Sequence, residues 1–160
     1  MHRLFIAIRP PKWVRDQLLQ LMGSVGGVRW QSDEQLHLTL RFIGEVDRHR
    51  ATDVHAALGT IHHQRFEVAL SGIGSFERRD PPEALWAGVS PHGRLEKLHH
   101  KVDQALTRVG LEPERRAYLP HITLPRLNRS AGPIAGLLEQ SGGLTSAPFT
   151  VDAFCLYESH

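Results

Sequence analysis

The sequence of 160 residues contains little cysteine, little lysine and no long hydrophobic run. Cys155 is the only cysteine, which excludes an internal disulfide and a multi-cysteine zinc site and is typical of a reducing compartment. The apolar run near the N-terminus is stopped by Arg9 and two prolines, so it is too short for a signal-peptide core or a membrane span. We therefore expect a cytoplasmic protein without a membrane partner.

A strong charge of one sign is also missing, since the net charge is +2, although the isoelectric point is about 9.0. Arginine far outnumbers lysine, and its planar guanidinium group suits contacts with phosphate. A genome rich in G and C would produce the same bias. Low-complexity tracts are absent, and 41% of the residues are hydrophobic, which is enough for one core. We predict a single domain over residues 1–160.

Apolar periodicity predicts strands and helices in alternation along the chain. Strands are expected at residues 4–8, 37–43, 66–70, 84–89, 119–124 and 149–157. Helices are expected after Pro11 as far as the glycines at 23–27, and at residues 48–60, 93–109 and 134–138. Gly44 is expected to end the second strand, and Gly72 and Gly74 to mark a long loop.

The order of strand, helix and histidine-bearing strand occurs twice. His37 and His121 each begin a His-x-Thr-Leu motif and lie 84 positions apart (121 minus 37). The strands that open the two halves, at Leu4 and Leu85, lie 81 positions apart (85 minus 4). So constant a register indicates a duplicated unit. A pseudo-twofold relation between the halves would bring both motifs to one central cleft.

The repeated motif predicts a reaction centre. Side chains alternate between the faces of a strand, so His37 shares a face with Thr39, and His121 with Thr123. One neutral imidazole can deprotonate water while a protonated one donates to a leaving group, and the hydroxyl groups can hold phosphate oxygens. These residues favour phosphodiester cleavage without a metal ion or a cofactor. A purely structural use of histidine and threonine in strands is the alternative, but it does not explain their joint repetition.

The other histidines lack a recognised pattern of metal ligands. Adjacent histidines on one element point apart, and the two adjacent pairs are not spaced with carboxylates as metal ligands are. We expect these pairs to be surface residues, and the remaining histidines to lie on helices or loops without a partner nearby in the sequence: His62, His63, His99, His100, His49, His55 and His92.

These motifs resemble those of the 2H phosphoesterases, in particular the bacterial and archaeal RNA 2′,3′-cyclic phosphodiesterases, also called 2′-5′ RNA ligases. The resemblance runs almost end to end and rests on residues 3–8, 37–46, 85–89, 110–114, 120–124 and 156–159. It implies an α+β fold with two pseudo-symmetric lobes, in which two antiparallel sheets line a central cleft and helices lie outside. It also implies hydrolysis of RNA 2′,3′-cyclic phosphate ends to 2′-phosphate ends. Similar proteins usually continue with one more strand after residues 156–159.

The resemblance assigns roles to individual residues. It implies that His37 is the proton donor to the 3′-oxygen, that His121 is the proton acceptor that activates water, and that Thr39 and Thr123 bind the phosphate. Arg126 stands where a substrate-binding arginine follows the second motif; Pro125 precedes it and can break the alternation that would turn Arg126 away from His121.

Two further residues are candidates from their position on the first histidine-bearing strand. By counting along this strand, Arg41 shares the face of His37. Phe42, together with Phe5, is a candidate for a base-stacking wall, and core packing is the competing use of each ring.

Two other functions stay open. A non-catalytic RNA-binding or nucleotide-binding module could use the same cleft, although a pure binder has no need of two titrating groups. The same centre could also run in reverse as a 2′-5′ ligase, with a 5′-hydroxyl in place of water. We expect a monomer whose partner is an RNA with a 2′,3′-cyclic phosphate end, and nucleotides are further candidate ligands. The base preference is not determined by the sequence.

Overall fold

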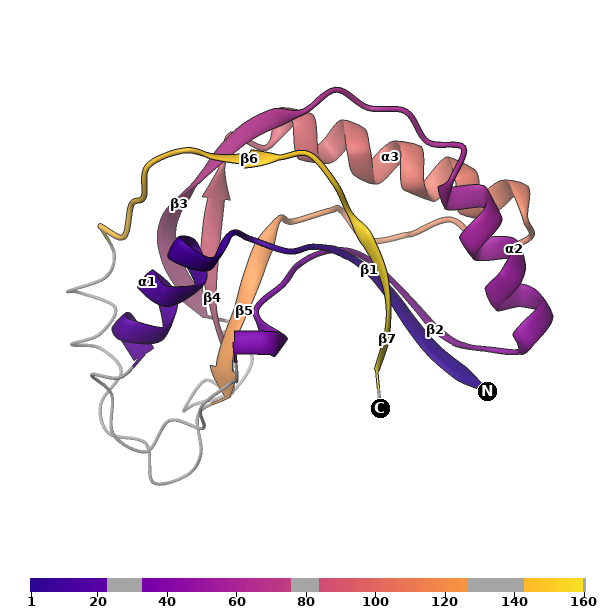
Figure 1. Cartoon of the computed structure of the whole chain (residues 1–160), viewed down its shortest axis with the longest axis horizontal. Coiled ribbons are helices and arrows are strands. Elements are labelled where there is room, and N and C mark those ends of the chain that lie inside the picture. Colours follow the sequence, from indigo (N-terminus) through magenta and orange to yellow (C-terminus); the bar gives the residue numbers. More distant parts are fainter. Residues whose placement is uncertain (23–32, 76–83, 127–142, 160) are drawn as a thin grey trace.

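The computed structural model describes residues 1–22, 33–75, 84–126 and 143–159 (Figure 1). Its strands are β1 His2–Ile8, β2 Leu38–Val46, β3 Phe66–Ser75, β4 Ala84–Ser90, β5 His121–Arg126, β6 Phe149–Val151 and β7 Cys155–Ser159. Its helices are α1 Lys12–Met22, α2 Arg48–Leu58 and α3 Gly93–Arg108, with a short 3-10 helix, η1, at Asp33–Gln35.

The strands form one curled antiparallel sheet in the order β6-β3-β4-β5-β2-β1-β7. The two histidine-bearing strands, β2 and β5, are neighbours in the middle of this order. Their register contains a single residue pair, Leu38 with Ile122. Long ladders on either side, β1 with β2 and β4 with β5, flank this narrow junction.

Each half of the chain places one strand beside a strand of the other half. β3 follows β2 in the sequence but pairs with β4, on the far side of β5. β7, the last strand, returns to pair with β1 along Arg3 to Ala7. Figure 1 shows the N-terminal and C-terminal ends side by side as a result. Each end of the sheet therefore contains strands from both halves of the chain.

The core is one cluster of buried side chains from α1, α2 and α3 and from strands β1 to β6. Asp47 begins α2 by accepting a hydrogen bond from the Arg50 amide through its side chain, as N-cap residues do. Burial of apolar side chains from the central strands and from α3 supplies the main stabilising contribution. Fully buried members include Ile6, Leu36, Leu38, Leu95, Leu106, Val102 and Ile122.

Most predicted elements are confirmed, with three differences. Gly44 does not end β2: its φ of 87° lets it lie within the strand, paired with Leu4. Gly72 and Gly74 lie in β3 rather than in a loop, and Gly72, with φ of 78°, sits at a register shift of that strand. The predicted final strand at residues 149–157 is two strands, β6 and β7, at opposite edges of the sheet.

The predicted combination of helices with antiparallel strands is confirmed. The two expected sheets are joined into one strand order through Leu38 and Ile122. Within the ranges described, no helix is long and apolar enough to cross a membrane. The helix expected at residues 134–138 lies outside the described residues.

Candidate active site

The two His-x-Thr motifs meet at the junction between β2 and β5. Leu38 and Ile122, the residues that follow the two histidines, form the only pair of this junction and are completely buried. Because side chains alternate in paired strands, the flanking positions point to the opposite face. Thr39, His121 and Thr123 line one cavity of about 730 Å³ on that face. His37 stands directly before β2, at the same junction.

His37 is enclosed by two aromatic rings. Its imidazole lies edge-on to Phe5, with ring centroids 5.6 Å apart, and to Tyr157, with centroids 4.5 Å apart. Phe5 and Tyr157 stack on each other at 5.1 Å. Burial, followed by the positive charge of Arg9, lowers the pKa of His37, and a hydrogen bond with the backbone of Gln35 opposes this shift.

The turn before His37 is fixed by two arginines. Arg9 donates through Nη1 to the carbonyls of Asp33 and Leu36, at 2.7 and 3.0 Å, and through Nη2 to the Asp33 carboxylate at 3.0 Å. Arg15 donates through Nε to the other oxygen of that carboxylate at 2.8 Å. This network holds η1, which carries the Gln35 backbone group bonded to His37.

His121 has its ring oriented by a carbonyl two residues earlier, as His37 does. The distance from His121 Nδ1 to the Leu119 carbonyl oxygen is 2.7 Å. A carbonyl only accepts hydrogen bonds, so Nδ1 carries the hydrogen and a neutral ring has its lone pair on Nε2. This tautomer leaves Nε2 as the proton acceptor.

Trp86 packs beside His121, with ring centroids 6.2 Å apart. The indole lies over Gly74 of β3, where an added Cβ would come within 2.1 Å of Trp86 Cζ2. Trp86 stands 81 positions after Phe5, the separation at which the opening strands repeat. Each histidine thus has an aromatic neighbour at the same place in its half of the chain.

Histidine His99 was expected at the surface, and this prediction is wrong. His99 is half-buried and lines the cavity together with Thr39 and His121. Its ring stacks in parallel on Tyr118, with centroids 4.3 Å apart and an interplanar angle of 1°. Tyr118 donates from its hydroxyl to the Thr39 carbonyl at 3.0 Å. Helical spacing alone did not reveal this residue, because its partner comes from a loop.

The predicted ligands on β2 separate at a strand irregularity. Thr39 lies opposite Ala7 of β1 and Arg41 lies opposite Ile6, so Leu40 is an extra residue in β2. Strict alternation fails at this point, because the adjacent residues Leu40 and Arg41 are both buried. Arg41 forms an ion pair with Asp103 of α3 and donates to the Glu112 carbonyl. The expectation that Arg41 simply shares the face of His37 is therefore wrong in its reasoning, although Arg41 borders the cavity.

Phe42 lines the cavity, whereas only the backbone of Arg126 is described. The Phe42 side chain is 71% exposed, lines the cavity and lies 6.0 Å from Phe5 between ring centroids. The backbone of Arg126 pairs with Ala84 at the end of β5. The Arg126 side chain lies outside the described part of the structure.

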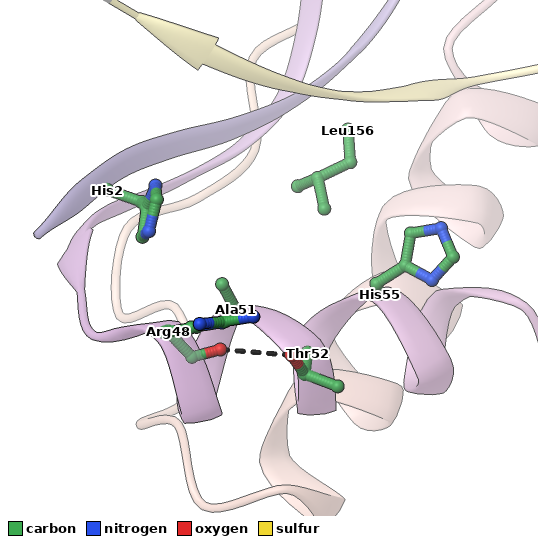
Figure 2. Close-up of a pocket in the computed structure, with 6 residues that line it drawn as sticks. All are labelled: His2, Arg48, Ala51, Thr52, His55 and Leu156. Carbon is green, nitrogen blue, oxygen red and sulfur yellow. Dashed lines mark hydrogen bonds between the residues drawn. The ribbon is translucent and has the colours of Figure 1, made fainter.

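A second cavity, of about 660 Å³, lies between α2 and the edge formed by β1 and β7 (Figure 2). It is lined by His2, Arg48, Ala51, Thr52, His55 and Leu156. Leu156 borders this cavity while its neighbour Tyr157 contacts His37, so this cavity and His37 lie on opposite faces of β7. None of the predicted site residues borders it.

No cluster of three or more potential metal ligands occurs among the described residues. Of the other residues in the adjacent pairs, His62 and His100 are exposed as predicted, whereas His63 is half-buried beside Phe66 and Phe154, so its surface prediction is wrong. The histidines expected on helices or loops are exposed: His49, His55 and His92. Each motif histidine is oriented by the backbone two residues earlier, and His121 lines the cavity with the two motif threonines; an oriented imidazole is suited to acid–base chemistry.

Comparisons with known proteins point in one direction. The family model of the 2′-5′ RNA ligase superfamily matches residues 16–160. An RNA 2′,3′-cyclic phosphodiesterase of Aeropyrum pernix is 35% identical over 79% of this chain and 74% of its own length. One of Thermotoga maritima is 31% identical over 98% of this chain and 86% of its own. The crystal structure of Escherichia coli LigT with 3′-AMP matches with a TM-score of 0.79 and 27% identity, over 99% of this chain and 88% of LigT.

Proposed function

The chain belongs to the 2′-5′ RNA ligase superfamily and is an RNA 2′,3′-cyclic phosphodiesterase, and we propose that it performs this hydrolysis with His37 and His121 as an acid–base pair. The observation that carries the mechanism is the meeting of both His-x-Thr motifs at the Leu38–Ile122 junction. The mechanism is also supported by the way both imidazoles are oriented: each forms a hydrogen bond with the backbone two residues earlier, at Gln35 for His37 and at Leu119 for His121.

His121 takes the proton-accepting role in this mechanism. Its Nε2 removes a proton from water, and the resulting hydroxide attacks the phosphorus of the cyclic ester. The bond from phosphorus to the 3′-oxygen breaks, and His37 donates a proton to that oxygen. The product carries a 3′-hydroxyl and a 2′-phosphate, and the two histidines exchange protonation states in one turnover.

The lowered pKa of His37 is compatible with its role as donor. Burial and Arg9 disfavour the imidazolium form in the free enzyme. A bound cyclic phosphate adds a negative charge close to the ring, and a nearby opposite charge favours the protonated form. Substrate binding thus protonates His37 at the moment when a donor is needed.

The remaining predicted residues take supporting roles. Thr39 and Thr123 donate their hydroxyl hydrogens to the non-bridging oxygens, where charge accumulates as phosphorus becomes five-coordinate. Phe42 offers an exposed ring to a base beside the phosphate. Arg126 binds the substrate phosphate, while the ion pair of Arg41 with Asp103 gives that arginine a mainly structural role.

We further propose that the fold is a duplicated unit with a pseudo-twofold axis at the Leu38–Ile122 pair. On either side of it, a histidine-bearing strand is followed in the sheet by the strand that opens its half, β1 or β4. The outer neighbour of each opening strand, β7 or β3, comes from the other half of the chain. The equivalent positions of Phe5 and Trp86 beside the two histidines support the same relation.

Nucleotides are proposed ligands of the cavity beside the junction. Solved structures of LigT hold 3′-AMP and ATP, and both match this chain over 99% of its length. We propose that nucleotides bind here as substrate analogues, that the protein acts as a cytoplasmic monomer, and that ligation of 2′-5′ ends is the reverse of the hydrolytic step.

The mechanism is tested with a short RNA that ends in a 2′,3′-cyclic phosphate, in the presence of EDTA. Wild type is expected to release a 2′-phosphate end, and His37→Ala or His121→Ala to lower kcat/KM by about 10²- to 10⁴-fold. The double variant is expected to be little worse than either single one, because the pair acts as a unit. His55→Ala, in the second cavity, serves as the control and should retain full activity.

Hydrolysis that survives both substitutions, or that requires added metal, would overturn the two-histidine mechanism. Retained RNA binding by an inactive wild type would instead favour the non-catalytic binding module.

A further inference from the structure

Among the described residues, His99 lines the same cavity as His121, Thr39 and Thr123. His99 lies in the middle of α3, whose buried face is formed by Leu95, Leu98 and Val102. One face of the His99 ring is covered by Tyr118 at a centroid distance of 4.3 Å, and the ring borders the cavity that Thr39, His121 and Thr123 also line. No step of the hydrolysis described above uses this imidazole.

The stacked pair has a fixed position relative to the phosphate ligands. Tyr118 donates its hydroxyl hydrogen to the Thr39 carbonyl at 3.0 Å. Burial raises the pKa of Tyr118, so the hydroxyl stays protonated and remains a donor at neutral pH. The wall formed by His99 and Tyr118 is therefore tied to the same residue that supplies one of the two phosphate-binding hydroxyls.

The cavity beyond this wall has the size and surface of a nucleoside site. Its volume, about 730 Å³, falls within the range of roughly 300–1,000 Å³ typical of small-molecule sites. Phe42 and Leu119, 71% and 49% exposed, add apolar surface to its lining. Flat apolar and aromatic surfaces next to a phosphate centre are suited to an unstacked base.

We propose that Tyr118 holds His99 in place in the wall of the base site, and that a ring nitrogen of His99 forms a hydrogen bond with the edge of the base of the terminal nucleotide. His99 is then a specificity-determining residue for the cyclic-phosphate end. This inference rests on the proposed function.

The charge state of His99 agrees with this role. Burial lowers its pKa most; Asp103 and Glu114 act in the opposite direction, while Arg41 and His100 lower it further. A neutral imidazole offers one donor and one acceptor, as base edges do, whereas an imidazolium offers only donors. His99 can therefore form hydrogen bonds with a base without adding a charge next to His121.

The test compares kcat and KM for the four nucleoside 2′,3′-cyclic phosphates. His99→Phe keeps a ring on Tyr118 and removes the two nitrogens, and His99→Ala removes the ring as well. His100→Ala, an exposed neighbour on the same helix, is the matched control. We expect His99→Phe to bring the kcat/KM ratio between the best and worst base close to one at a nearly unchanged average KM. We expect His99→Ala to lose the base preference as well and to raise KM for all four substrates, because it also removes the ring on which Tyr118 stacks, with kcat little changed.

The control should match wild type in all parameters. A wild type with no preference among the bases, or a preference that His99→Phe leaves intact, would overturn the proposal. If His99→Ala is poorly folded by circular dichroism, His99→Phe decides alone. Failure of the wild type to hydrolyse either these substrates or a cyclic-phosphate RNA would contradict the proposed function itself, and is thus a separate outcome.

Discussion

At the scale of single residues, the two motif histidines share one mode of orientation but differ in their surroundings. Both are bonded to the backbone two residues earlier, Gln35 for His37 and Leu119 for His121. His37 lies against two aromatic rings and close to Arg9, whereas His121 has Trp86 beside it. Identical motifs therefore have different aromatic neighbours.

Arg9→Gln is predicted to raise the pKa of His37. Arg9 is the largest charge that disfavours the His37 imidazolium, so its removal makes protonation easier. The titration midpoint of His37, followed by NMR, should move to higher pH, and the limb of the pH–rate profile that belongs to His37 should move with it. Arg9→Lys keeps the charge and should keep the midpoint low.

Lys12→Gln is the control, because it also removes one positive charge, from an exposed position three residues after Arg9. A His37 midpoint that is unchanged in Arg9→Gln would show that Arg9 acts only through its hydrogen bonds to η1.

The proposed catalytic residues could be named from the sequence because strand alternation and repetition are local properties. His37, Thr39, His121 and Thr123 all follow from two short motifs. The environment of His37 was not predictable, since Phe5 of β1, Tyr157 of β7 and Arg9, directly after β1, are distant from it in the sequence. His99 was missed for the same reason, because its contact with Tyr118 joins a helix to a distant loop.

At the scale of elements, β2 shows how a local irregularity redirects side chains. Extra residues in β2 shift its register against β1 twice, around Leu40 and around Ile43. The first shift turns Arg41 to α3, where it meets Asp103, and leaves Phe42 exposed at the cavity. Simple alternation predicted the strand correctly but not the direction of this arginine.

Arg41→Met is predicted to destabilise the fold by about 3–5 kcal/mol, because it leaves the Asp103 carboxylate without its cation in a largely buried place. Chemical denaturation measures this change. Arg41→Met combined with Asp103→Leu should recover much of the loss. Lys12→Ala, which breaks an exposed pair with Asp16, should cost less than about 0.5 kcal/mol.

If Arg41→Met does not destabilise the fold, the main role of Arg41 is substrate binding rather than stability. In that case Arg41→Met would leave the unfolding midpoint nearly unchanged and raise KM for the cyclic phosphate.

The remaining errors at this scale concern glycine and the last strand. Glycine is a common signal for a turn, yet Gly44 and Gly72 use their positive φ inside strands, which only the pairing of neighbouring strands decides. Residues 149–157 have the composition of one strand. The chain divides there because β6 pairs with β3 and β7 pairs with β1, at opposite edges of the sheet.

At the scale of the whole molecule, stability is predicted to fall as the pH decreases below about 6.5. His37 and His99 both have pKa values lowered from 6.5 by burial. Below 6.5 the unfolded chain takes up protons at these two residues more readily than the folded protein does. The free energy of unfolding therefore decreases until the pH has passed the lower, folded-state values.

Urea denaturation at pH 7.5 and at pH 5.5 checks this dependence in a range where carboxylates stay ionised. The variant with both His37→Gln and His99→Gln should lose less stability between the two pH values than wild type. His55→Gln, at an exposed position, should behave as wild type does. An equal loss in all three proteins would assign the acid sensitivity to other groups.

Each end of the sheet contains strands from both halves of the chain, and this arrangement bears on the origin of the proposed two-histidine site. Two separate copies of a half-length ancestor would exchange their last strands and place one imidazole each on the symmetry axis, as a homodimer. Both imidazoles would then be chemically identical, although one must give a proton while the other takes one. Fusion into a single polypeptide removes that constraint: Tyr157 and Arg9 can adjust His37 alone, with Trp86 left to His121. A single chain can give its two histidines different surroundings before any substrate binds, whereas a symmetric homodimer gives both the same.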